Sequence, residues 1–139
     1  MILQLRFPEI GLALRRQGAD IITFPSAFTV PTGKAHWETL LRARAIETQS
    51  YVIAAAQVGR HNEKRVSYGH SMIIDPWGVV LVDLGDNSFE PEVAVAEIDH
   101  ELLNKVRREV PLARRTNVYS FPQGRIPGLT HLSDVYPEI

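Results

Sequence analysis

The 139-residue chain has the length of one domain and is nearly neutral, with 15 lysines and arginines against 16 aspartates and glutamates. This balance offers no electrostatic basis for binding nucleic acid or an anionic membrane surface. The sequence contains no cysteine, which excludes disulfide bonds, cysteine-ligated zinc and a thiolate nucleophile from this chain.

The N-terminal stretch lacks the pattern of a secretory signal, because Arg6 and Pro8 interrupt the apolar residues that precede Glu9. No apolar run approaches the roughly 20 residues that a transmembrane helix requires. We therefore expect a cytoplasmic protein that has no association with membranes.

The first half of the chain alternates helical and strand patterns. Pro8 suits the first turn of a helix that stops at Gly18, where a residue with a left-handed backbone ends it. After a loop that contains Pro31 and Gly33, apolar residues recur at helical spacing with charged residues between them, which predicts a second helix. The expected elements after Gly18 are a strand at 21–24, a loop at 29–34, a helix from 35 to about 50 and a strand at 51–56.

The second half predicts a hairpin, a strand and a capped helix. The turn from Asp75 to Gly78 has proline at its second position and glycine at its fourth, which favours a tight turn between two strands. Asp99 is a good N-cap for the helix that follows it. The expected elements are an exposed loop at 59–67, strands at 69–74, 79–82 and 93–98, a helix after Asp99, and an irregular tail at 120–139. This order predicts an α/β fold.

Four separated blocks carry a family resemblance: Leu5–Glu9 (LRFPE), Phe24–Phe28 (FPSAF), His36–Glu38 (HWE) and Arg42–Glu47 (RARAIE). In this combination the chain resembles the nitrilase (carbon–nitrogen hydrolase) superfamily, and within it the Nit-type deaminated-glutathione amidases. The resemblance runs from about residue 5 to residue 119. It implies a four-layer α-β-β-α sandwich. Residues 1–119 then form a truncated domain that corresponds to the C-terminal half of this sandwich.

The same resemblance implies that the catalytic groups of the family are missing here. The family's nucleophilic cysteine falls on Ile2, and the tyrosine and aspartate that follow it fall on Leu3 and Gln4. Isoleucine has no nucleophilic atom. The family's two glutamates and its lysine lie on the N-terminal side of the cysteine, in segments that this chain does not contain. We therefore assign no catalytic residue, and we expect no metal and no cofactor.

The resemblance does assign residues to the scaffold. Ser26, Ala27 and Phe28 match a segment that walls the substrate pocket. Arg6 and Glu9 match the turn behind the nucleophile. Arg42 and Glu47 match a helix that carries buried ion pairs and lies near a dimer interface in relatives. The structural-support residues are thus Arg6, Glu9, Arg42 and Glu47.

Serine–histidine groups, the histidines and one charged stretch each suggest a site but have a simpler structural interpretation. His70, Ser71 and Asp75 have the residue types of a hydrolase triad, but adjacent residues of a strand point to opposite faces, so hairpin structure is favoured. Ser26 with His36 is likewise better explained as a serine in a turn. The five histidines have no metal-binding spacing, and the charged stretch 59–65 is better explained as a solvated loop than as a nucleic-acid site.

Three functions remain open. In the first, which the resemblance implies, the chain is the C-terminal half of an amidase that hydrolyses the C–N bond of a small carboxylate substrate such as deaminated glutathione through a thioester, and as written it is expected to be catalytically silent. Alternatively, it is a non-catalytic module that binds a second copy of itself or a full-length Nit-type subunit. A third possibility is a fragment without independent function, because half a sandwich exposes apolar strands at 21–24, 51–56 and 71–74 to aggregation.

Overall fold

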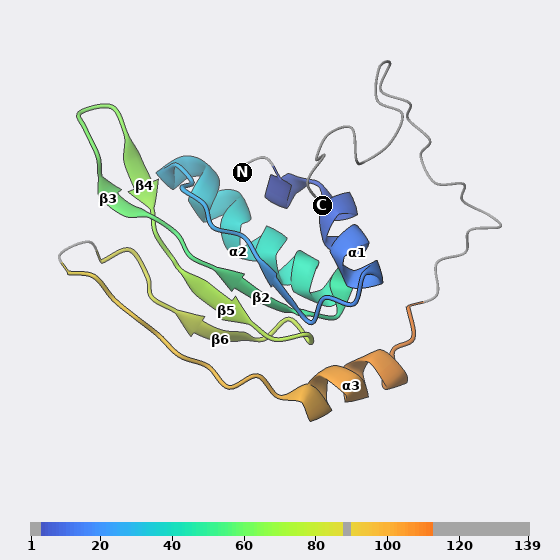
Figure 1. Ribbon diagram of the computed structural model, residues 1–139. Coiled ribbons are helices and arrows are strands. Elements are labelled where there is room, and N and C mark those ends of the chain that lie inside the picture. The colour runs from blue at the N-terminus through green and yellow to red at the C-terminus, as the bar shows by residue number, and fades with distance from the viewer. Residues whose placement is uncertain (1–3, 88–89, 113–139) are drawn as a thin grey trace, which may run out of the picture.

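The computed structural model describes residues 4–87 and 90–112 (Figure 1). The predicted tail at 120–139 therefore lies outside the described residues. The elements are a 3-10 turn at Gln4–Arg6, α1 Pro8–Arg16, β1 Ile21–Thr23, α2 Val30–Thr48, β2 Tyr51–Ala54, β3 Val58–Arg60, β4 Val66–Tyr68, β5 Met72–Ile74, β6 Val80–Asp83 and α3 His100–Glu109.

A four-stranded mixed sheet in the order β1-β2-β5-β6 forms the centre of the fold. Strands β1 and β2 are parallel, whereas β5 runs antiparallel to both of its neighbours. Strands β3 and β4 form a separate two-stranded hairpin, which projects beyond one end of the main sheet in Figure 1. This arrangement of helices around a mixed sheet confirms the predicted α/β class.

Helix α2 covers one face of the sheet and contributes three side chains to the core beneath it. Its buried apolar side chains follow helical spacing at Trp37, Leu41 and Ala45, which places them on one side of the helix. They meet the strand residues that point toward the helix. The core cluster consists of Leu5, Ile22, Phe24, Phe28, Trp37, Leu41, Ala45, Val52, Ala54, Met72 and Ile74.

Helix α2 begins five residues before the predicted position, so the expected loop at 29–34 is wrong. Pro31 lies in the first turn, where its missing N–H costs no hydrogen bond. Gly33 is needed there for a different reason. A Cβ atom at Gly33 would lie 2.2 Å from Cγ of Tyr68, because the tyrosine ring packs directly on the helix backbone.

The charged stretch predicted as an exposed loop at 59–67 is instead the end of a hairpin. Val58 pairs with Tyr68 and Arg60 with Val66 across β3 and β4. The turn is closed by a 2.9 Å hydrogen bond from the His61 amide to the Arg65 carbonyl. The alternation of apolar residues was too short to show this strand pair against its many charges.

Two other predictions are confirmed in detail. The Asp75 carboxylate accepts hydrogen bonds from the amides of Trp77 and Val79, each at 2.9 Å, and so fixes the turn between β5 and β6. Asp99 caps α3 by accepting bonds from the amides of Glu101 and Leu102 at 2.8 and 2.9 Å. The turn was predicted from Pro76 and Gly78 and the cap from Asp99, whereas the hydrogen bonds of the Asp75 carboxylate were not predicted.

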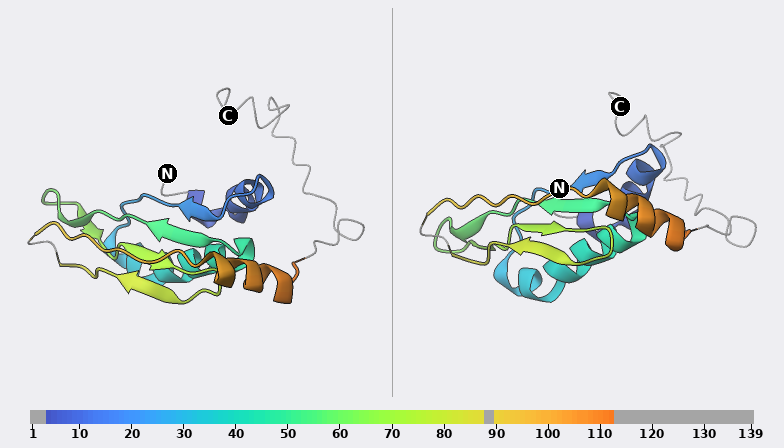
Figure 2. Two further views of the ribbon diagram at one scale, coloured as in Figure 1. Left: turned by 60° about the horizontal axis from the view of Figure 1, so that its bottom comes forward. Right: turned by 90° about the horizontal axis from the view of Figure 1, so that it is seen from below.

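The face of the sheet that points away from α2 is less well covered within the described residues. Ile53, Ile73 and Val82 lie on this face in neighbouring strand positions and are half-buried, while Ile21 at the β1 edge is 41% exposed. Residues 90–98 cross this face in an extended path (Figure 2). A strand predicted at 93–98 is not present, because this segment pairs with no neighbouring strand in the described part of the chain.

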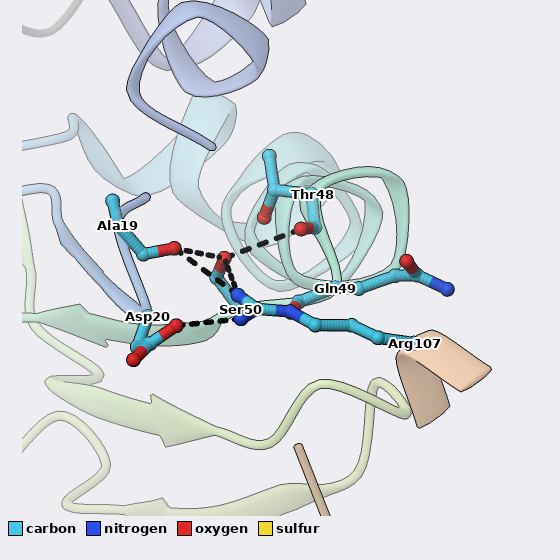
Figure 3. A network of polar contacts seen from close by, with 6 residues as sticks. All are labelled: Ala19, Asp20, Thr48, Gln49, Ser50 and Arg107. Atoms are coloured by element: carbon cyan, nitrogen blue, oxygen red, sulfur yellow. Dashed lines mark hydrogen bonds and ion pairs between the residues drawn. The ribbon is translucent and has the colours of Figure 1, made fainter. Parts of the chain in front are cut away.

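Arg107 of α3 forms a network of hydrogen bonds at one end of the sheet, where β1 and β2 begin (Figure 3). Its guanidinium donates to the Asp20 carboxylate at 2.6 Å and to the Ala19 carbonyl at 3.2 Å. Its Nε donates to the carbonyl of Gln49 at 3.1 Å. Ser50 completes the network with a 3.0 Å bond from its hydroxyl to the Ala19 carbonyl. One side chain thus ties α3 to the start of β1 and to the α2–β2 turn.

We predict that Arg107→Ala lowers the free energy of unfolding by about 2 kcal/mol, because several partly buried acceptors lose a charged donor together. Arg108→Ala is the matched control, since Arg108 is exposed on the same helix. Urea unfolding of the two variants and the parent chain measures the difference. Equal free energies of unfolding for the two variants would show that the Arg107 hydrogen bonds do not stabilise the fold.

We also predict different outcomes for alanine at two helical glycines, with a loss of stability at Gly33 and little change at Gly11. Gly33→Ala should cost about 2 kcal/mol, because the Tyr68 ring is too close to accommodate a methyl group. At Gly11 an added Cβ would lie 3.1 Å from Thr48 Cγ2, a tight contact that the gain in helix propensity of up to about 1 kcal/mol can offset. Thermal unfolding of both variants tests this, and a stable Gly33→Ala would contradict the packing of Tyr68.

Candidate functional site

A groove opens where the parallel strands β1 and β2 end side by side. The chain continues beyond both strands, and Ser26 pairs with Ala56 through bonds of 2.9 Å from the Ser26 amide to Ala55 and 3.1 Å from the Gln57 amide to Ser26. Ligands of α/β proteins commonly bind outside the carboxyl ends of parallel strands. We call this the strand-end groove; its volume is about 530 Å³ and it is lined by Pro25, Ser26, Ala27, Ala55, Ala56, Gln57 and Ser71.

Ser71 lines the groove and follows His70 directly in the sequence. Its hydroxyl is nevertheless hydrogen-bonded to the backbone and not to the histidine. Its Oγ accepts a 2.9 Å hydrogen bond from the Ala56 amide and donates at 3.3 Å to the Ala56 carbonyl. These bonds attach the start of β5 to the end of β2. The Ser71 hydroxyl therefore uses its one O–H donor, and one of its lone pairs, in hydrogen bonds with the backbone.

The His70 side chain pairs with Asp83 rather than with Ser71 or Asp75. Its Nδ1 lies 2.9 and 3.0 Å from the two carboxylate oxygens of Asp83, and its ring stacks on Tyr68 with centroids 4.2 Å apart. The backbone of His70 has a left-handed conformation with φ of 59°. Its carbonyl accepts a 2.7 Å hydrogen bond from the Trp37 indole, which holds this strained position.

A second cavity shares Ala56, Gln57 and Ser71 with the strand-end groove and has a volume of about 350 Å³. His61 and His70 line it together with Glu90 and Glu92. The His61 Nε2 and the Ser67 hydroxyl are 2.7 Å apart, so this imidazole also has a protein partner. Across residues 4–87 and 90–112 there is no group of three histidine, aspartate or glutamate side chains placed to hold a metal ion.

The three predicted pocket-wall residues occupy different surroundings. Ser26 and Ala27 line the strand-end groove. Phe28 is buried in the core, where its ring centroid lies 4.9 Å from that of Trp37 and 5.6 Å from the guanidinium carbon of Arg6. Their role toward a substrate stays a prediction.

The predicted support residues are spread over the 3-10 turn, α1 and α2. Arg6 lies near the His36 ring at 3.3 Å, and Glu9 is exposed in the first turn of α1, where a carboxylate favours the helix dipole. Arg42 donates at 2.9 Å to the Gly78 carbonyl, which attaches α2 to the β5–β6 turn. Glu47 pairs with Arg44.

Arg44 is a structurally important residue that the sequence analysis did not single out. It is only 4% exposed, and its Nε donates at 3.0 Å to the Leu5 carbonyl. Helical spacing from Leu41 to Thr48 places residue 44 on the buried side of α2, so the signal was present in the sequence. Position 2, where the family's cysteine falls on Ile2, lies outside the described residues.

A profile of the carbon–nitrogen hydrolase family matches residues 1–108. The chain therefore belongs to the carbon–nitrogen hydrolase family, that is, to the nitrilase superfamily. Within residues 4–87 and 90–112, no helix is long and apolar enough to cross a membrane.

Two curated relatives show which branch the chain is similar to. It is 56% identical over 115 residues to the probable hydrolase nit2 of Schizosaccharomyces pombe, covering 83% of this chain and 42% of the relative. It is 56% identical over 117 residues to the deaminated glutathione amidase of Homo sapiens, covering 83% of this chain and 35% of the relative. The chain thus spans less than half the length of these relatives.

Solved structures show the same fold. The NitFhit protein of C. elegans matches with a TM-score of 0.76 and 50% identity, over 84% of this chain and 28% of that protein. Saccharomyces cerevisiae Nit3, a nitrilase-superfamily member, matches with a TM-score of 0.74 and 35% identity, over 81% of this chain and 40% of that protein. The predicted fold, a part of the nitrilase sandwich, is confirmed.

We predict that Tyr68, beside the His70–Asp83 pair, titrates late. Burial raises the pKa of its hydroxyl above the ordinary 10.0, and the Asp83, Asp86 and Glu38 carboxylates raise it further. A raised folded-state pKa stabilises the fold below pH 10, and this contribution is lost as the pH rises through the folded value. Alkaline titration of tyrosinate absorbance in parent and Tyr68→Phe chains should assign a late component to Tyr68.

Asp83→Asn provides the second arm of this titration. It removes one carboxylate but leaves the ring half-buried, so the pKa of Tyr68 should fall only part of the way toward its ordinary value. A Tyr68 that ionises at its ordinary pKa in the parent chain would contradict the burial seen here.

Proposed function

We propose that this chain is the scaffold half of a Nit-type amidase domain, and that the strand-end groove forms part of the wall of its substrate pocket. The lineage reaction is hydrolysis of the amide C–N bond of a small carboxylate substrate such as deaminated glutathione. The observation that carries the proposal is the 56% identity to a deaminated glutathione amidase across most of the chain. The position of Ser26 and Ala27 at the ends of two parallel strands supports it.

By themselves, these 139 residues are proposed to be hydrolytically silent. Thioester chemistry needs a thiolate, and the sequence contains no cysteine. Of the two serines that line the groove, Ser71 is bonded to backbone on both its donor and acceptor sides, and the neighbouring His70 is directed to Asp83. When members of such a site act as a unit, loss of the nucleophile alone removes most of the acceleration.

The second candidate is a non-catalytic module that binds a full-length Nit-type subunit or a second copy of this chain. The specific observation in its favour is the sheet face that α2 does not cover, where Ile53, Ile73 and Val82 remain partly accessible. Apolar surface of this kind marks an interaction site or an aggregation hazard. A fragment without function is the outcome if the chain only aggregates.

The test is an amidase assay on the purified 139-residue chain with deaminated glutathione, followed by light scattering after size exclusion with and without a full-length Nit-type amidase. We expect no hydrolysis above buffer from the chain alone. Ile2→Cys should stay silent, because the general base and lysine of the family are still lacking. A defined complex with the full-length enzyme supports the module, whereas void-volume aggregate supports the fragment.

Hydrolysis by the parent chain alone would overturn the proposal, since it would require a nucleophile other than cysteine. Ser26→Ala and Ser71→Ala are then the informative variants, because these two serines line the groove. If activity survived both changes, neither hydroxyl of the strand-end groove would be the nucleophile.

A further inference from the structure

The tight turn between β5 and β6 presents a tryptophan to solvent. Trp77 is 60% exposed, and Val79, two residues later, is 49% exposed. Ile46 of α2, also 49% exposed, packs closely on the same turn, because a Cβ atom at Gly78 would lie 2.7 Å from its Cδ1. We call these three apolar side chains, Ile46, Trp77 and Val79, the Trp77 patch.

The exposure of Trp77 does not come from a loose loop. The Asp75 carboxylate accepts hydrogen bonds of 2.9 Å from the Trp77 and Val79 amides. The Gly78 amide donates at 3.0 Å to the Asp75 carbonyl, and the Gly78 carbonyl accepts a 2.9 Å bond from Nε of Arg42 on α2. The turn is thus bonded both within itself and to α2, so the tryptophan is held in its outward position.

An ordered apolar patch of this kind favours a contact beyond the described residues. A covered aromatic side chain removes about 150–250 Å² from water, and tryptophan is among the residues that contribute most to binding interfaces. More than half of the Trp77 side chain lacks such a cover within the described part of the chain. Burial of the indole and its two aliphatic neighbours would therefore stabilise whatever segment lies across them.

The described chain ends on the same side of the sheet as the Trp77 patch. Val52, near the start of β2, pairs with Ile74 at the end of β5, so the β5–β6 turn lies at the end of the sheet where β2 begins. Helix α3 is attached at that end, because the Tyr51 hydroxyl accepts a 3.0 Å bond from the Asp99 amide. Figure 1 shows α3 and the β5–β6 turn together there, and the chain continues from α3 into residues 113–139.

Residues 120–139 lie beyond the stretch that resembles the family, and their composition suits a covered segment. Large apolar side chains occupy seven of these twenty positions, namely Phe121, Ile126, Leu129, Leu132, Val135, Tyr136 and Ile139. Segments that stay solvated contain few aromatic and β-branched residues. The linking residues 113–119 can span roughly 24 Å when extended, which crosses several strands spaced about 4.8 Å apart. The segment can therefore reach the Trp77 patch from the end of α3.

The prolines of this segment also match an exposed tryptophan. Pro122, Pro127 and Pro137 are spread along it and disfavour a continuous helix. Extended segments that contain proline dock on exposed aromatic side chains in known recognition modes, because their backbone loses little conformational entropy on binding. An indole held outward on a rigid turn is a surface of this kind.

We propose that residues 120–139 of this chain fold back over the Trp77 patch and cover it. Apolar side chains of the segment contact Ile46, Trp77 and Val79, and its prolines pack on the indole. This inference does not rest on the proposed amidase lineage, because it uses only one ordered patch, the place where the described chain ends and the composition of the residues that follow.

Tryptophan fluorescence tests the cover directly, since the chain has two tryptophans and Trp37 is only 1% exposed. Acrylamide should quench Trp77 weakly in the 139-residue chain. Leu129→Asp combined with Leu132→Asp should displace the segment and raise this quenching severalfold, whereas Thr130→Ser in the same segment should leave it unchanged. The Trp77→Phe chain gives the emission of Trp37 alone, which identifies the Trp77 component and reports whether each variant retains its core.

A spin label distinguishes cover by the same molecule from cover by a second copy. Because the chain contains no cysteine, Ser133→Cys provides a single site for a nitroxide, which should quench Trp77 within the labelled chain. Labelled chains that also carry Trp77→Phe, mixed with unlabelled parent chains, should produce no quenching. Quenching in that mixture would overturn the proposal, because a second copy would then supply the cover. Strong acrylamide quenching of Trp77 in the parent chain would overturn it as well, and neither readout depends on amide hydrolysis.

Discussion

Burial of one side of α2 against the sheet is the interaction on which the other elements depend. Trp37, Leu41 and Ala45 fill the space over Ile22, Val52 and Ile74, and an aliphatic side chain such as Leu41 contributes about 1.5–3 kcal/mol by leaving water. The same helix receives the Tyr68 ring at Gly33 and holds the Leu5 carbonyl through Arg44. The strand-end groove exists because this packing sets β1 and β2 side by side with their carboxyl ends level.

The sequence predicted the elements whose signals are local. Pro8, Asp75 and Asp99 each act within a few residues of their own position, so α1, the β5–β6 turn and the cap of α3 were predictable. The failures differ in cause. The start of α2 at Val30 was missed although Pro31 is a local signal for a first helical turn, whereas the β3–β4 pairing depends on cross-strand contacts. Residues 93–98 have strand alternation without a strand beside them.

The only residues of the candidate site that were predicted are those that belong to a family motif. Ser26 and Ala27 were found in this way and line the groove, whereas the same motif includes Phe28, which the Trp37 ring holds in the core. No motif pairs His70 with Asp83, because the hairpin brings them together across thirteen positions with a glycine-like backbone at His70. Tertiary geometry, not residue type, decides which serine and which histidine can meet.

The Arg107 network also imposes an order on synthesis. Its partners Ala19 and Gln49 precede it in the chain by 88 and 58 residues. A ribosome releases the chain from its N-terminus, so β1 and the α2–β2 turn emerge long before the guanidinium that bonds them. Until then the acceptors at Ala19, Asp20 and Gln49 are open to water or to chaperones. Docking of α3 is therefore the step at which a nascent chain commits this end of the fold.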